Sequence, residues 1–122
     1  MSRPLGGATR DFDDGAEVNA ADLDIPLSPL PAEQVQEGAP LAGSVALGEF
    51  AGCEVGVWEH TVGASSDVEA DELFVVLSGT ATVEFIDDER VAHLGPGTVM
   101  RLEAGQRTVW TVTETLRKVY LS

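Results

Sequence analysis

The sequence predicts an all-β sandwich or barrel. From about Leu41 onward, short apolar or alternating runs are separated by clusters of turn residues. No stretch shows helical periodicity with capping residues, apart from a single turn at 31–36. The predicted strands are residues 44–50, 53–61, 72–79, 81–87, 91–94, 98–103, 107–113 and 116–122.

The connections between these strands are rich in turn-forming residues. The longest, VGASSDVEAD at 62–71, and the acidic DDER at 87–90 are interpreted as loops. LGPG at 94–97 and EAGQ at 103–106 supply glycine and proline where the chain must reverse. Residues 38–122 are therefore predicted to form one β domain.

Residues 1–37 have a different composition. They hold eight acidic and two basic side chains and four prolines, without sustained periodicity. We interpret them as a flexible acidic N-terminal segment followed by an extended docking arm, which is expected to cross to a partner subunit. The apolar side chains of this arm are Leu23, Ile25, Leu27 and Leu30.

Composition excludes several classes of function. The net charge of -14 disfavours binding to nucleic acid or to anionic membrane surfaces. No run approaches the roughly 20 apolar residues of a membrane span, and no secretory signal is visible. With one cysteine, Cys53, no intrachain disulfide can form, so a reducing, cytoplasmic location is expected.

The strand that begins at Glu72 is apolar on both faces. Neighbouring side chains on a strand point to opposite sides. A strand buried on both sides needs a barrel core beneath it and a second sheet or a partner subunit above it, which favours a homodimer. The two faces carry Glu72, Phe74 and Val76 on one side, and Leu73, Val75 and Leu77 on the other.

Several motifs then carry a family resemblance. The stretch from Glu72 to Gly79 resembles the end of the first conserved motif of the cupin superfamily. GPGTVMRLEAGQRTVW, which begins at Gly95, resembles the second motif. The ordered set GVWEHTVG, DELFVVLSGTATVEF, LGPGTVMRLEAGQRTVW and RKVYL is similar to the small single-domain branch that includes the ureidoglycine aminohydrolase cupin domain. Over residues 40–122 this implies a double-stranded β-helix, the cupin jelly-roll barrel, and points to C–N chemistry.

The ligands of metal-binding cupins are mostly missing. In that family two histidines before the glutamate and one beyond the second-motif glycine complete the site. Here the corresponding positions hold Ser65, Ser66, Asp67 and Val68, and then Thr108, so only Glu72 is kept and no cofactor is expected. An atypical divalent site from Glu72 and His60, with Asp67 and Cys53, stays open, although a hydrogen-bonded His60 and an inert Cys53 are the more ordinary interpretations.

Glu72 needs a partner if it is buried while ionised. Lys118 is the natural counter-charge, and alternation places Lys118 and Tyr120 on one face of the last strand. We therefore expect Glu72, Lys118 and Tyr120 to be the catalytic or orienting groups of a pocket for a small polar molecule. The ligand-binding candidates are Trp58, His60, Phe74, Thr108 and Trp110.

Three functions remain open at this stage. The first is an enzyme in which Glu72 is a general acid or base and acts on a small nitrogenous or carbonyl compound. The second is a ligand-binding module without turnover. The third is a structural dimer with a vestigial pocket, because buried ion pairs are weak indicators of function.

Overall fold

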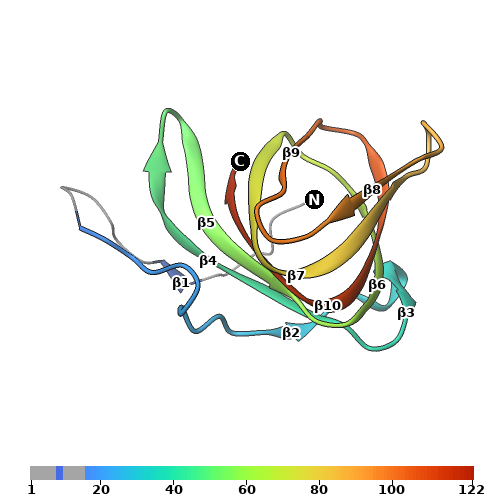
Figure 1. Ribbon diagram of the computed structural model, residues 1–122, viewed down its shortest axis with the longest axis horizontal. Coiled ribbons are helices and arrows are strands. Elements are labelled where there is room, and N and C mark those ends of the chain that lie inside the picture. The colour runs from blue at the N-terminus through green and yellow to red at the C-terminus, as the bar shows by residue number, and fades with distance from the viewer. Residues whose placement is uncertain (1–7, 10–15) are drawn as a thin grey trace.

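The computed structural model describes residues 8–9 and 16–122 (Figure 1). Most of the predicted acidic tip lies outside these residues. The amino-terminal elements are short: β1 (Ala8–Thr9), β2 (Ser28–Pro29), a 3-10 helix η1 (Ala32–Gln34) at the predicted single turn, and β3 (Val35–Glu37). The main strands are β4 (Leu41–Phe50), β5 (Cys53–His60), β6 (Gly63–Val68), β7 (Glu72–Phe85), β8 (Arg90–Leu94), β9 (Val99–Leu102) and β10 (Arg107–Leu121).

The strands form one curled antiparallel barrel, with β10 as its central strand. β10 pairs with β5 and β6 on one side and with β7 on the other, while β7 also pairs with β8 and β9. Figure 1 shows β6, β7, β9 and β10 curling around a common interior, with the β4–β5 hairpin extending to one side. The predicted all-β fold, a jelly-roll barrel, is confirmed.

Two predicted boundaries are wrong because strand pairing overrides a local turn signal. The strands predicted at 72–79 and 81–87 are one continuous strand, β7, which ends at Phe85, and the two predicted carboxyl-terminal strands merge into β10. Both long strands bend where their register shifts, between Val112 and Lys118. Gly79, at φ +91°, permits this bend, since a Cβ there would lie 2.1 Å from the Thr115 carbonyl oxygen.

β6 is a strand that the sequence analysis misses. Its residues, GASSDV, were assigned to the loop at 62–71 because small polar residues are poor strand formers. In the structure β6 pairs with β10 over six residues and with β3 on its other side. The backbone partners on both sides hold the segment extended despite its composition.

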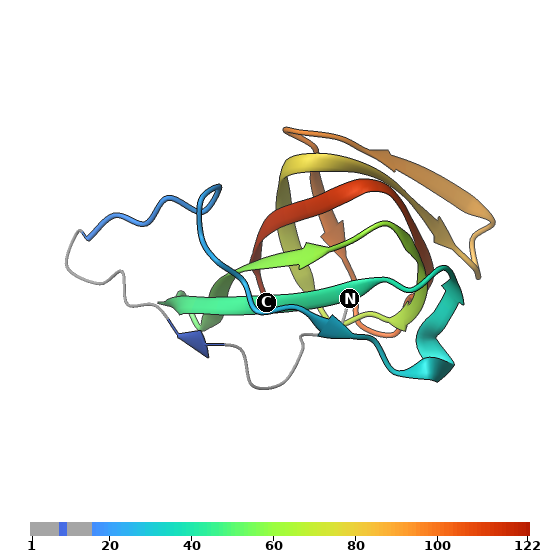
Figure 2. The same cartoon turned by 90° about the horizontal axis from the view of Figure 1, so that it is seen from below.

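The arm packs against its own chain in the structure, and the expected crossing to a partner subunit stays a prediction. Leu23 and Ile25 pack, with Val18 and Ala20, against the outer side chains of Val45, Leu47, Val57 and Val119. Gly43 allows this close approach, because a Cβ there would lie 2.0 Å from the Pro26 carbonyl oxygen. Arg117 Nη1 also donates to the carbonyl oxygens of Ala20 and Ala21, at 3.0 and 3.1 Å. Figure 2 shows the arm running beside β4.

The barrel interior holds the main core. Large aromatic and aliphatic side chains from β5, β7, β9 and β10 fill it, and they surround the few polar groups considered next. The structure contains no helix long and apolar enough to cross a membrane, within the residues it describes. The apolar core side chains include Trp58, Phe74, Val83, Leu102, Trp110, Leu116 and Tyr120.

Candidate functional site

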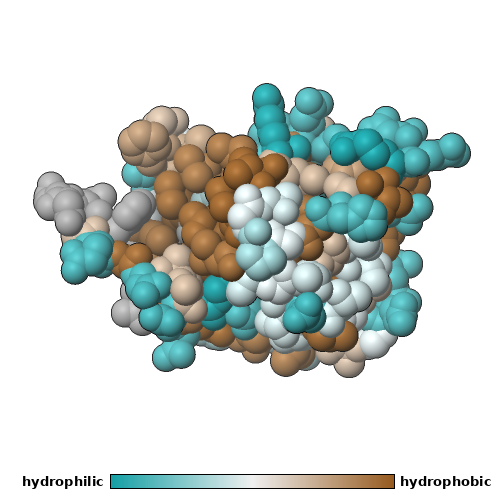
Figure 3. Space-filling view, viewed as in Figure 1, coloured by the Kyte–Doolittle hydropathy of each residue, from teal (hydrophilic) through white to brown (hydrophobic). Residues whose placement is uncertain are grey.

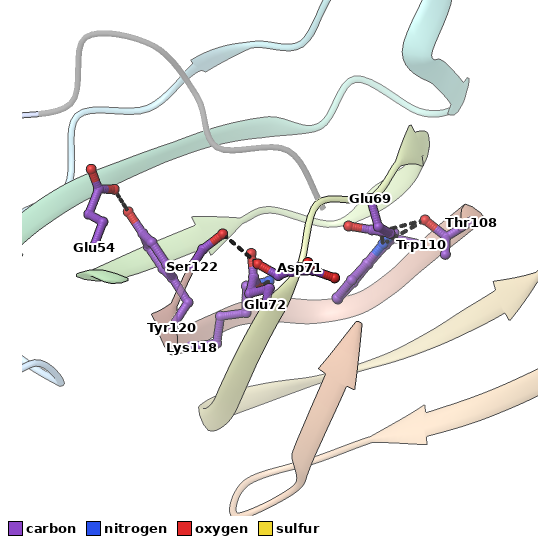
Figure 4. Close-up of polar contacts among 9 residues, drawn as sticks. All are labelled: Glu54, Glu69, Asp71, Glu72, Thr108, Trp110, Lys118, Tyr120 and Ser122. Carbon is purple, nitrogen blue, oxygen red and sulfur yellow. Dashed lines mark hydrogen bonds and ion pairs between the residues drawn. The ribbon is translucent and has the colours of Figure 1, made fainter. Parts of the chain in front are cut away.

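A buried ion pair joins β7 to β10 inside the barrel. Lys118 lies opposite Val76 in the register, so its long side chain runs back over Phe74 toward the start of β7. There its Nζ donates to Glu72 Oε2 at 2.5 Å. The exposed fraction is 0% for Lys118 and 4% for Glu72. The structure therefore places both groups where the sequence analysis expected them, paired with each other (Figure 4).

Three aromatic rings surround the ammonium group of Lys118. Its Nζ lies 4.6 Å from the ring centroid of Trp58, 4.3 Å from that of Phe74 and 4.9 Å from that of Trp110. The rings also contact one another, with Trp58 and Trp110 centroids 5.7 Å apart in an edge-on arrangement. Electron-rich ring faces replace part of the hydration that the cation loses on burial.

The electrostatic balance at Lys118 has opposing contributions. Burial lowers the pKa of Lys118, and the carboxylates of Glu72 and Asp67 partly oppose this shift. The protonated form of Lys118 is thus stabilised by one hydrogen bond and three aromatic rings, and it is destabilised by the loss of hydration on burial. Such a group can release or accept a proton more readily than an exposed lysine.

His60 lies beside this cluster, with both ring nitrogens engaged. The Thr61 carbonyl oxygen can only accept, so Nδ1 carries the proton and donates to it at 2.6 Å. Nε2 then accepts a hydrogen bond from Ser65 Oγ at 2.9 Å. Burial, with a smaller contribution from the charge of Lys118, lowers the pKa of His60. The ring is therefore a neutral hydrogen-bonded group packed 5.5 Å from Trp58.

A second acidic group, Glu69, was not among the predicted site residues. Its Oε2 accepts from Thr108 Oγ1 at 2.6 Å and from Trp110 Nε1 at 3.0 Å, and the residue is buried. Thr108 and Trp110 were expected to contact a ligand, and their polar atoms instead meet this carboxylate. A buried tryptophan requires a hydrogen-bond acceptor for its indole N–H. This requirement at Trp110 is the one sequence signal that could have suggested an acceptor side chain such as Glu69.

Tyr120 was expected to be a catalytic or orienting group beside Glu72 and Lys118. Its hydroxyl donates to Glu54 Oε2 at 2.7 Å. The ring lies against Gly56, where a Cβ would stand 2.5 Å from the phenol oxygen. Figure 4 shows the Tyr120–Glu54 contact on one side of the Glu72–Lys118 pair and the Glu69–Thr108–Trp110 contacts on the other.

The candidates for an atypical metal site do not assemble. Within residues 16–122, no group of three or more His, Cys, Asp and Glu side chains is placed to hold an ion. The Lys118 ammonium already lies against Glu72, and the nitrogens of His60 are hydrogen-bonded elsewhere. Cys53 is a half-buried free thiol at the start of β5.

The chain is similar in fold to solved structures of several bacterial proteins. A Pseudomonas syringae protein of unknown function matches with a TM-score of 0.72 at 21% identity, over 85% of this chain and 46% of that one. The EutQ protein of Clostridium difficile matches with a TM-score of 0.57 at 17% identity, over 67% and 61% of the two chains. A cupin superfamily protein of Desulfitobacterium hafniense matches with a TM-score of 0.55 at 18% identity, over 80% and 96%.

At these identities the likeness shows a shared fold. No curated protein matches the sequence. The family model of the EutQ-like cupin domain matches residues 47–120, which include Glu72, Lys118 and the three surrounding rings. This match covers more than half of the sequence, and the chain therefore belongs to the EutQ-like cupin domain family.

Proposed function

We propose that the barrel binds a small polar organic ligand at the Glu72–Lys118 pair. The observation that carries this proposal is the burial of a hydrogen-bonded carboxylate and ammonium within a ring of three aromatic side chains. Binding sites for small molecules combine apolar walls with a few polar groups that fix orientation. This cluster has both parts.

The cost of the pair supports a role other than stability. Taking two charges out of water costs several kcal/mol per ion, and well-packed apolar residues in the same place are often as stable or more so. Nearby Leu116, Leu102 and Val76 show that the interior accepts such residues. The pair instead supplies one strong acceptor and one strong donor, so it suits a ligand with both a donor and an acceptor.

A ligand with an amide-like or ureido-like carbon suits these groups chemically. Glu72 would take a proton from a water molecule as the water oxygen attacks that carbon, and Lys118 would donate a hydrogen bond to the carbonyl oxygen. The C–N bond then breaks, and the proton held by Glu72 passes to the departing nitrogen. The resemblance to the ureidoglycine aminohydrolase branch supports C–N chemistry of this kind.

Tryptophan fluorescence is a direct test of binding, because both tryptophans of the chain lie against Lys118. A panel of small amides, ureido acids and amino acids would be titrated, with calorimetry to confirm each hit and ammonia release to detect turnover. We expect a hit that Lys118→Met abolishes and Arg107→Met leaves unchanged, since Arg107 pairs with Asp87 on the outer surface. Equal binding to both variants would contradict the proposal.

A second candidate function is a structural barrel with a vestigial pocket. It is favoured by one observation: Glu72 and Lys118 already satisfy each other, so the folded barrel requires no ligand at this pair. In that case no compound of the panel binds. Replacing both residues by methionine would then leave every property but stability unchanged.

A further inference from the structure

The sequence contains one lysine, Lys118, and its six other basic residues are arginines. A lysine that served only solubility would lie at the surface, where Figure 3 shows hydrophilic side chains at many places along the outline of the face it presents. Lys118 is instead 0% exposed. The one primary amine among the side chains of this protein is therefore kept inside the barrel.

The surroundings of Lys118 are those of a nucleophilic amine. A lysine attacks a carbonyl carbon in its neutral form, and desolvation in an apolar pocket makes that form easier to reach. Three aromatic rings have their centroids within 4.9 Å of Nζ, and burial lowers the pKa of the amine. An arginine in the same place could also pair with Glu72 but would stay protonated. The choice of lysine thus suits a covalent role.

Glu72 is placed to move the protons that such a reaction transfers. Its Oε2 lies 2.5 Å from Nζ, so a proton can pass directly between the two groups. His60 is the other titratable ring beside the cluster, and its hydrogen bonds to Thr61 and Ser65 hold both of its nitrogens. The acid and the base of each step are therefore the same carboxyl group.

The charges of the interior favour an uncharged carbonyl compound. Glu69 and Glu72 are both buried, and the charge of Asp67 also acts on Lys118. The carboxylate of a keto acid or of an acidic aldehyde would add a fourth negative charge, against one ammonium, where solvent screens weakly. The aromatic rings around Nζ suit a short alkyl chain. A small aldehyde without charge fits both conditions.

We propose that Lys118 forms a Schiff base with a small uncharged aldehyde. A small molecule must reach the Glu72–Lys118 pair for this to occur, and in that respect the step rests on the proposed function. Nζ gives a proton to Glu72, its lone pair forms a C–N bond to the carbonyl carbon, and the carbonyl oxygen takes that proton from Glu72. A second proton then passes from the nitrogen through Glu72 to the hydroxyl group, which leaves as water while the C=N bond forms.

The product keeps the charges of the interior unchanged. The protonated Schiff base carries the positive charge that the ammonium carried, and Glu72 ends as a carboxylate beside it. The buried charges therefore stay compensated, so the reaction leaves neither of them without a partner. Return of water to the C=N carbon releases the aldehyde, and the adduct is reversible until it is reduced.

Reduction with cyanoborohydride makes the adduct permanent and so provides the test. The folded full chain is incubated with propanal and cyanoborohydride at neutral pH, and intact mass with peptide mapping assigns the propyl group to Lys118. We expect labelling of Lys118 at least about tenfold faster than in the same chain unfolded in guanidinium chloride, because Glu72 is in place to transfer the protons. Glyoxylate, an aldehyde that carries a carboxylate, should label Lys118 more slowly than propanal.

Two variants of β7 test the role of Glu72. Glu72→Gln should slow the labelling by about tenfold or more, because the proton carrier is gone, although loss of the carboxylate makes neutral Lys118 easier to form. Glu84→Gln is the matched control, since Glu84 is an exposed glutamate of the same strand, and it should label like the unmodified chain. Circular dichroism confirms that each variant is folded. Unchanged labelling in Glu72→Gln would overturn the proton transfers assigned to that residue.

The labelling result is distinguishable from the fluorescence titration. Trapping of propanal at Lys118 without binding of any amide or ureido acid supports the Schiff base and contradicts hydrolysis at the pair. Binding of an amide with no propyl group on Lys118 overturns the Schiff base and leaves the proposed binding function in place. Labelling that is no faster in the folded chain than in the unfolded one, or equal for glyoxylate and propanal, also overturns the proposal.

Discussion

The ammonium of Lys118 and the carboxylate of Glu72 share a 2.5 Å hydrogen bond, and both side chains are buried inside the barrel. Their charges are therefore compensated by each other and not by water. Removing one partner leaves the other charge buried, whereas removing both leaves an apolar interior. The single and double changes should thus act in different ways on stability.

Lys118→Met should lower the free energy of unfolding by about 3–5 kcal/mol at neutral pH, because Glu72 is left buried without its partner. The Glu72→Met/Lys118→Met double variant should recover most of this loss, since the three rings then pack against an apolar side chain. Urea unfolding at constant pH measures both values.

The matched control for that comparison is Asp87→Asn. It breaks an exposed ion pair with Arg107, which lies on the same strand as Lys118, and should change the free energy of unfolding little. A double variant as unstable as the single one would show that the pair acts as two independent charges.

His60 should make stability depend on pH on the acid side. Its pKa is lowered in the folded barrel, so below about pH 6.5 the unfolded chain binds a proton that the folded chain does not. The contribution of His60 to the free energy of unfolding is therefore lost as the pH falls below about 6.5, with a slope of at most about 1.4 kcal/mol per pH unit. His60→Gln should flatten the slope between about pH 7 and about pH 5, measured by urea unfolding, whereas the exposed His93→Gln should not. An unchanged slope in His60→Gln would mean that another group titrates there.

The parts of the site that alternation could define were predicted correctly. Glu72 and Phe74 share the buried face of β7, and Lys118 faces them from β10, as the two-residue period requires. The partners that lie outside such a pattern were not found. Glu69 belongs to a loop, and its contact with Trp110 joins residues 41 positions apart in the chain.

Strand boundaries show the same limit. Composition alone places β6 in a loop, because its six residues are held extended by pairing partners on β10 and β3 that are remote in sequence. Likewise, Tyr120 is on the predicted inner face, yet its hydroxyl reaches Glu54 because Gly56 leaves room for the ring. Three-dimensional packing therefore decides which polar groups form hydrogen bonds with each other. The local sequence around each residue does not determine these pairs.

Gly56→Ala should destabilise the barrel by about 1–3 kcal/mol, because the new Cβ would overlap the ring of Tyr120, with its nearest atom 2.5 Å away. Gly95→Ala is the control, since a Cβ at Gly95 meets nothing within 4 Å. Thermal unfolding of the two variants gives the comparison. If Gly95→Ala proved the more harmful change, the packing of Tyr120 against Gly56 would not be a determinant of stability.

Gly43→Ala should release the arm without unfolding the barrel. A Cβ at Gly43 would lie 2.0 Å from the Pro26 carbonyl oxygen, so the chain near Ile25 must move away from β4. Hydrogen exchange at residues 18–27 should become faster. Release of the arm would also expose Val45 and Val57, which are buried in the unmodified protein, and should therefore increase the binding of a hydrophobic dye. Exchange within β7 and β10 serves as the internal reference and should not change. Faster exchange over the whole chain would indicate instead that the arm and the barrel unfold together.

Purified protein should contain divalent metal far below one ion per chain. A cation approaching Glu72 meets the Lys118 ammonium at 2.5 Å from the same oxygen, and it must also displace the hydrogen bonds of His60 to Thr61 and Ser65. Mass spectrometry of metal content, on protein prepared without a chelator or a nickel-binding tag, should therefore give the same low value for the unmodified chain and for Glu72→Gln. Added zinc, manganese or nickel should leave the unfolding midpoint unchanged. A stoichiometric metal that is lost in Glu72→Gln would mean that Lys118 moves aside to admit the ion, and metal-assisted hydrolysis would then replace the acid–base role proposed for the pair.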